Sequence, residues 1–178
     1  MQAFVLLLRG INVGGHRKVK MAELKVVLQE LDFQNIATYI QSGNVIFSAE
    51  ETNISKLKHT AEEAIKVHFG FAVSCFIIPK ETFLTIIENN PFIETEEITK
   101  LYITFLNETP NPEKLETLKT FETSDELFIL KNNTLYFCYE NGYGKAKIAN
   151  PFIEKKLNLQ ATTRNWKTMM KLLELLNS

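Results

Sequence analysis

Hydrophobic residues in the first eighty positions alternate between the spacings of strands and of helices. Residues 3–8 (AFVLLL) form a continuous apolar run, which predicts a buried strand. Apolar positions recur at helical spacing over residues 20–31 and again over residues 54–68, where Gly70 supplies a C-terminal stop. Further strands are predicted at residues 36–41, 45–48 and 71–78.

This order of elements is β-α-β-β-α-β, the ferredoxin-like split unit. A right-handed crossover from the first strand to the second leaves room for the third strand between them. Ser42-Gly43-Asn44 is predicted to make a tight hairpin turn of type II′, with the glycine at its first central position. The loop after residues 3–8 then lies at the same end of the sheet as this turn, so we expect the two to be neighbours.

The second half repeats part of this pattern after a connector at residues 79–99. The predicted elements are a strand at 101–106, a helix at about 112–120, strands at 126–131 and 135–139, a helix from Asn150, and a last amphipathic helix at about 163–177. No fourth strand is evident. The predicted fold class is therefore α+β, with one ferredoxin-like half at residues 1–78 and a variant of it at residues 100–178.

The composition is that of a soluble globular protein, because 45% of the 178 residues are hydrophobic and 23% are charged. The apolar run at residues 3–8 is too short for a signal peptide or a membrane span, which indicates a cytoplasmic protein with no membrane partner. Cys75 and Cys138 lie in apolar runs and are predicted to be buried free thiols, with a single disulfide as the alternative.

Charge is distributed unevenly along a chain whose net charge is −1. Residues 1–20 carry +4 without any acid, residues 141–178 carry +5, and the middle of the chain carries −10. Such asymmetry concerns partners more than fold, and it favours an anionic ligand. The alternative is two unrelated solvated faces.

The glycine loop RGINVGGHRKVK is the clearest candidate site. Gly10 and Gly15 have the spacing of a P-loop, but His16 stands where that motif needs lysine and no hydroxyl follows, which excludes a P-loop hydrolase. Glycine-rich backbone before a helix can still bind an anion. The alternative is a solvated loop whose glycines serve only its backbone geometry. The candidate ligand-binding residues here and in the neighbouring turn are Arg9, Gly10, Asn12, Gly14, Gly15, His16, Arg17, Lys18, Ser42, Gly43 and Asn44.

A second basic segment lies near the C-terminus. Lys145 and Lys147 lie in the glycine loop NGYGKAK. If the second half repeats the topology of the first, this loop lies at the opposite end of its own sheet from the end at which the first glycine loop leaves the first sheet. Arg164 is predicted on the last helix, in one basic stripe with Lys167 and Lys171; an ordinary amphipathic helix is the alternative. Lys145, Lys147 and Arg164 complete the candidate ligand-binding set.

Nothing in the sequence predicts a metal or a cofactor. His59 and His68 are nine residues apart on one predicted helix, too far for joint ligation, and the two cysteines lack metal-ligand spacing.

Four segments together resemble one family: RGINVGG, TYIQSGNVIF, NGYGKAK and ATTRNWKT. The resemblance is to the bacterial domain of unknown function 1697 family and covers nearly the whole chain. It implies a small cytosolic α+β protein with two ferredoxin-like halves, and it implies no activity. The positions that match the motifs are Arg9, Gly10, Asn12, Gly14, Gly15, Ser42, Gly43, Asn44, Gly142, Gly144, Lys147, Arg164, Asn165 and Trp166.

Three hypotheses of function follow. The favoured one is non-catalytic binding of a phosphate-bearing ligand, a nucleotide or a nucleic acid, at the glycine loop. The second is an enzyme acting on a small phosphorylated or carboxylated substrate, with His16 as the general acid or base. The third is a protein-interaction module that uses the acidic middle of the chain around Glu94, Glu96 and Glu97.

Overall fold

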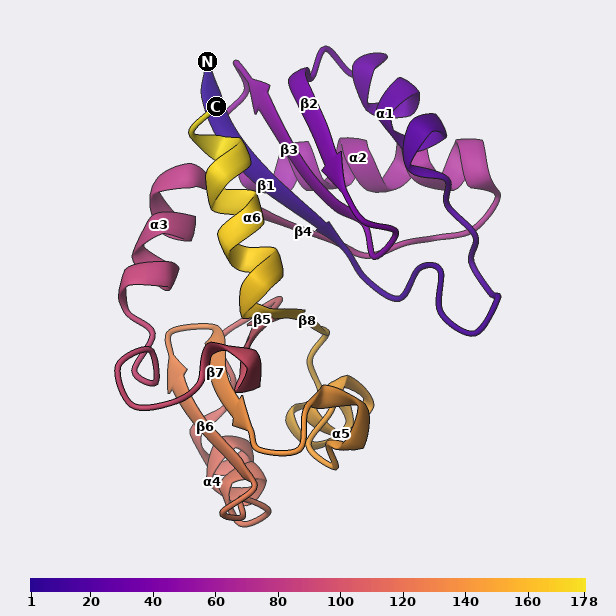
Figure 1. Ribbon diagram of the computed structural model, residues 1–178. Helices are drawn as coiled ribbons and strands as arrows, with labels where there is room; N and C mark the ends of the chain where they lie inside the picture. Colours follow the sequence, from indigo (N-terminus) through magenta and orange to yellow (C-terminus); the bar gives the residue numbers. More distant parts are fainter. The chain divides into compact units, whose positions relative to one another are not determined.

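The computed structural model describes residues 1–178 and has an α+β fold with two four-stranded antiparallel sheets (Figure 1). The chain divides into two compact units. The first consists of Met1–Thr85 with Lys171–Ser178, and the second of Ile86–Met170. No helix has the length and apolarity that crossing a membrane requires.

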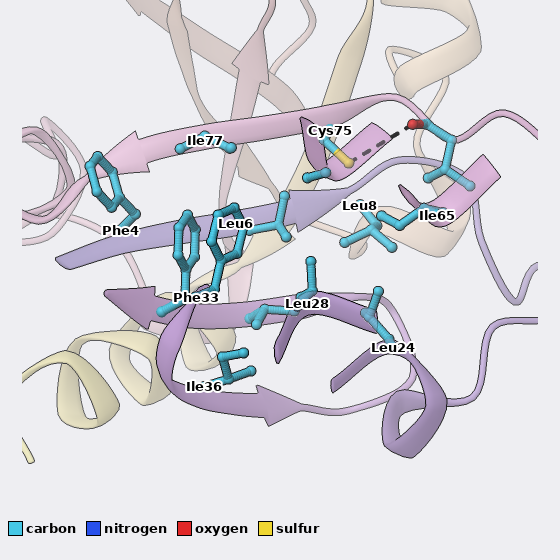
Figure 2. Close-up of a cluster of buried hydrophobic side chains, with 14 of the residues drawn as sticks. Phe4, Leu6, Leu8, Leu24, Leu28, Phe33, Ile36, Ile65, Cys75 and Ile77 are labelled. Atoms are coloured by element: carbon cyan, nitrogen blue, oxygen red, sulfur yellow. Dashed lines mark hydrogen bonds between the residues drawn. The ribbon is translucent and has the colours of Figure 1, made fainter. Parts of the chain in front are cut away.

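The first unit is built around the sheet β2-β3-β1-β4, in which β3 lies between β1 and β2 as predicted. Its elements are β1 (Gln2–Leu8), α1 (Met21–Gln29), β2 (Gln34–Tyr39), β3 (Asn44–Ala49), α2 (Ile54–Phe69), β4 (Cys75–Pro79) and the beginning of α3 (Lys80–Glu88). Alternate residues of β1 (Phe4, Leu6 and Leu8) share one core with Leu24 and Leu28 of α1 and Ile65 of α2 (Figure 2). Asn53 caps the start of α2, and Gly70 ends that helix at φ 80° as predicted.

The second unit repeats this arrangement, with the sheet order β6-β7-β5-β8. Its elements are the end of α3, a short 3-10 helix at Ile98–Lys100, β5 (Leu101–Leu106), α4 (Pro112–Lys119), β6 (Glu126–Lys131), β7 (Thr134–Tyr139), a second 3-10 helix at Tyr143–Lys145, α5 (Asn150–Leu157), β8 (Ala161–Asn165) and the first turns of α6 (Trp166–Leu176).

The fourth strand, β8, corrects the prediction that the second half lacks one. β8 pairs with β5 from Tyr102↔Asn165 to Leu106↔Ala161, and α6 begins at Trp166 rather than at residue 163. Local chemistry explains the boundary. Thr162 and Thr163 are β-branched and favour a strand, while the Asn165 side chain accepts a hydrogen bond from Thr168 N (2.8 Å) and so caps the helix.

The turn between β2 and β3 also differs from its prediction. Tyr39 pairs with Asn44, so the connection is the four-residue loop 40–43 and not a two-residue type II′ turn. Gly43 nevertheless has a positive φ of 77°, and Ile40 also adopts one of 50°. A longer loop is required because Asn44 is fully buried as the first residue of β3 and cannot serve as a turn residue.

Both units join their strands in the same way at one end of the sheet. In the first unit, Leu8 N donates to Gly43 O (2.8 Å) and Arg9 N to Ser74 O (2.9 Å). In the second, Leu106 N donates to Asn133 O (2.9 Å) and Asn107 N to Gln160 O (3.1 Å). The first glycine loop extends this end of its unit, whereas the loop with Lys145 follows β7 at the opposite end of the second unit's sheet, as predicted.

The two cysteines are free and buried, as predicted. Burial raises the pKa of the Cys75 thiol, and it also raises the pKa of the Cys138 thiol, with Glu96 and Glu140 adding to the effect.

Candidate functional site

The glycine loop forms a projecting ribbon, which we call the basic arch and define as residues 13–18. Asn12 closes its base: Asn12 Oδ1 accepts from Val19 N and Asn12 Nδ2 donates to Val19 O, both at 2.9 Å. Ile11 and Val19 on either side are buried in the core of the first unit. The base of the arch is therefore fixed to the fold at both ends, and Figure 1 shows the segment between β1 and α1 running away from the sheet.

The tip of the arch is a glycine turn. Asn12 N donates to Arg17 O and His16 N to Val13 O, both at 3.1 Å, so the segment is a small antiparallel ribbon. Gly14 and Gly15 have φ values of 59° and 79°, as the two central residues of a type I′ turn require. The turn at the tip therefore needs glycine at both positions.

The side chains of the arch are open to solvent. Val13 is 68% exposed, and His16, Arg17 and Lys18 are exposed as well. Neither Arg17 nor Lys18 has an acidic side chain within ion-pair distance, whereas Lys20 beyond the arch pairs with Glu23 at 3.0 Å. Two cations are thus presented without internal neutralisation.

The arch and the β2–β3 loop are neighbours, as predicted from the topology. Asn12 Nδ2 donates to Gln41 O at 2.6 Å. A Cβ added to Gly43 would lie 2.7 Å from Leu8 Cβ and 2.8 Å from Ile11 Cδ1, so only glycine fits this approach.

The remaining candidates of the first unit lie around the base of the arch and in the β2–β3 loop. Asn44 is buried, and its Nδ2 donates to Tyr39 O (3.0 Å) and to Ser42 Oγ (2.8 Å), which fixes the loop. Arg9 is half-buried and its backbone N–H joins the strand ends. Gly10 is exposed at φ 66° with open space around it. The sequence identified these positions, but it did not distinguish residues that hold the loop from residues that would contact a ligand.

In the second unit, Lys145 and Lys147 are exposed on the loop after β7. Sequence reasoning missed the residue that holds this loop, which is Glu126 at the start of β6. Its carboxylate accepts hydrogen bonds from Lys147 N (2.8 Å) and from Ile148 N (2.7 Å). No local sequence pattern predicts these hydrogen bonds, because 21 residues separate Glu126 from Lys147.

The prediction that Arg164 lies on the last helix is wrong. Arg164 lies on β8 and is only 7% exposed, so it cannot form a basic stripe with Lys167 and Lys171 on a helix. Its Nη1 donates to Thr162 Oγ1 and Thr163 O, both at 2.8 Å. Burial lowers the pKa of its guanidinium to about 10, because desolvation penalises the charged form.

Metal-binding geometry is absent: the structure contains no group of three or more His, Cys, Asp or Glu side chains placed as metal ligands.

Comparison with known proteins gives a family and a fold. The family described as "Protein of unknown function (DUF1697)" matches residues 1–136. A solved structure, that of the conserved bacterial protein SP0830 from Streptococcus pneumoniae, is similar over 98% of both chains, with 26% identity and a TM-score of 0.75. No curated protein matches the sequence.

Proposed function

The chain belongs to the DUF1697 family, whose description assigns no activity, and we propose from its own residues that it binds a phosphate-bearing ligand through the basic arch. The observation that carries the proposal is the pair Arg17 and Lys18, exposed and without acidic partners on a ribbon closed by Asn12.

Charge placement supports an anionic ligand. Exposed cations without partners keep their full attraction for an anion, since no internal carboxylate competes for them. Arg17 offers a planar guanidinium that can contact two phosphate oxygens at once, and Lys18 adds a point charge beside it. The closed base supports affinity as well, because a preorganised loop loses less conformational entropy on binding.

The shape of the arch supports a nucleic acid above a mononucleotide. The arch is a short ribbon with one isolated bridge between Val13 and His16 beneath the Gly14–Gly15 turn, and its side chains are exposed. A projecting ribbon contacts a long polyanion more extensively than it can enclose a small one.

Salt dependence tests the proposal. The probes are a short DNA duplex, ATP and inorganic phosphate, with fluorescence anisotropy for the duplex and calorimetry for the others, at 50 and 200 mM salt. The duplex should bind, with an affinity that falls as salt rises because counterions are released. The R17A/K18A variant should reduce the slope of log K against log salt by about 1.8.

A matched variant separates the arch from general charge. K25A/K66A likewise removes two exposed positive charges from the first unit, that of Lys25 on α1 and that of Lys66 on α2, which pairs with Glu63 at 3.6 Å. It should bind all three probes like the unmodified protein. The proposal fails if no probe binds at 50 mM salt, or if R17A/K18A and K25A/K66A behave alike.

Catalysis by His16 gains no support. His16 is exposed on the arch and has no carboxylate at ion-pair distance that would orient its ring. General acid–base catalysis requires a positioned group, so we retain binding as the proposed function.

We also propose that both halves are ferredoxin-like and that the protein works in the cytoplasm. The order βαββαβ and the identical strand order of the two sheets support the first point. The two free thiols support the second, because cysteines remain reduced in that compartment.

A further inference from the structure

A pocket of about 260 Å³ opens in the second unit, and none of its lining residues belongs to the arch. Its charged lining consists of Asp125, Glu126, Lys145 and Lys147. Its volume lies just below the range of about 300–1,000 Å³ that accommodates drug-sized molecules. It therefore suits a ligand of amino-acid size.

Hydrogen bonds hold the walls of the pocket in place. The Glu126 carboxylate fixes the lysine loop through Lys147 N and Ile148 N. The hydroxyl of the buried Tyr139 donates a hydrogen bond to Ile148 O at 2.7 Å, which also holds this segment. These contacts preorganise the pocket, so binding costs less conformational entropy.

The two acidic and two basic side chains of the lining sum to zero charge, but they do not form ion pairs with each other. No ammonium of Lys145 or Lys147 comes within ion-pair distance of the Asp125 or Glu126 carboxylate. A simple anion entering the pocket meets two carboxylates, and a simple cation meets two ammonium groups. A molecule that carries both charges can satisfy both pairs.

The pocket also has an apolar wall. Phe121 is 41% exposed and lines the pocket. Lys156 lies over its ring, with Nζ 4.3 Å from the centroid, and Phe152 packs edge-on at 5.0 Å. The ring is thereby held in position, and it offers apolar surface to the side chain of a ligand.

We propose that this pocket binds a small zwitterion, a free α-amino acid with an apolar or aromatic side chain. The ligand carboxylate contacts Lys145 and Lys147, its ammonium contacts Asp125 and Glu126, and its side chain packs on Phe121. The site is independent of the arch and of its proposed phosphate ligand.

Calorimetric titration with single-charge analogues tests the proposal. The probes are L-phenylalanine and L-leucine, with 3-phenylpropionate, which lacks the ammonium, and phenethylamine, which lacks the carboxylate. At least one amino acid should bind, and each analogue should bind at least about tenfold more weakly, because a charge-assisted contact is lost.

Variants localise the binding. D125N and K145A/K147A should each weaken amino-acid binding about tenfold, whereas K155A on the exposed face of α5 should not. R17A/K18A should leave amino-acid binding intact, so failure of the arch and failure of the pocket are distinguishable. The proposal is overturned if neither amino acid binds at millimolar concentration, if 3-phenylpropionate or inorganic phosphate binds as tightly, or if K145A/K147A changes nothing.

Discussion

Asn12 brackets the backbone of Val19, with its side-chain amide and carbonyl each 2.9 Å from the complementary group of that residue. The same amide nitrogen also donates to Gln41 O at 2.6 Å. One side chain thus closes the arch and joins it to the β2–β3 loop. A residue that sequence analysis proposed as a ligand contact is, in this structure, the closure of the loop that presents Arg17 and Lys18.

Asn12→Ala should therefore loosen the arch. Three hydrogen bonds are lost, and at about 1 kcal/mol each the free energy of unfolding should fall by about 1–3 kcal/mol in urea denaturation. Amide hydrogen exchange at Val19 should accelerate. Asn141→Ala removes an exposed amide with one long contact of 3.4 Å and serves as the control, with a change within about 0.5 kcal/mol. Unchanged exchange at Val19 would contradict this role of Asn12.

Gly43→Ala should be more costly than Gly70→Ala, although both glycines have nearly the same positive φ, 77° and 80°. The backbone strain is shared, about 1–2 kcal/mol in each. Only at position 43 does the new methyl meet Leu8 and Ile11, whereas Gly70 faces open space. Overpacking should add about 1–3 kcal/mol to the loss at Gly43, measured by thermal or chemical unfolding. Equal losses in the two variants would show that the core yields to the methyl.

Glu126→Ala should destabilise the loop after β7. Two backbone N–H groups lose their acceptor, so the free energy of unfolding should fall by about 2–4 kcal/mol. Glu126→Gln keeps one accepting oxygen and should lose about half as much. The exposed Glu30→Gln, which changes the charge equally, is the control and should be near neutral. If Gln and Ala cost the same in urea denaturation, hydrogen bonding is not what holds the loop.

The buried thiols should make stability depend on alkaline pH. Burial raises the pKa of Cys75 and of Cys138 in the folded chain above the unfolded value of about 8.5. Below that value the two states bind equal numbers of protons. Above it the unfolded thiols ionise first, so stability should fall by up to about 1.4 kcal/mol per pH unit for each thiol.

Denaturant unfolding between pH 8 and 9.5 measures this slope, which should flatten in the C75A/C138A variant. Both native thiols should also react slowly with a thiol reagent at pH 8 and rapidly in denaturant. Fast reaction in the native state would contradict the burial.

Arg164→Lys should lower stability and leave phosphate binding unchanged. The substitution loses the paired donation to Thr162 Oγ1 and Thr163 O inside the fold, at about 1–3 kcal/mol. The salt dependence of duplex binding should stay that of the unmodified protein, since Arg164 is buried on β8. The control is Lys167→Ala on the exposed side of α6, which should alter neither property. A reduced salt slope for Arg164→Lys would return this arginine to the ligand-binding set.

Local patterns in the chain predicted most elements, because their causes are local. The apolar run at 101–106 and the run at 126–131 became β5 and β6 within the predicted bounds, and Pro151 marks the first turn of α5. β8 was missed because its five residues follow the helix α5 closely, and its partner β5 lies about sixty residues earlier. Strand pairing across such a separation has no local signal beyond two β-branched residues.

By itself the sequence determined the α+β order of elements, the neighbouring positions of the arch and the β2–β3 loop, and the acid-free charge of residues 1–20. These follow from apolar periodicity and from chain connectivity, which act residue by residue. Only the tertiary structure decided that Asn12 and Glu126 hold loops through backbone N–H groups, that Arg164 is buried, and that two acids and two lysines line one pocket. The physical reason is that burial and hydrogen-bond partners depend on residues distant in the chain, and the fold alone brings them together.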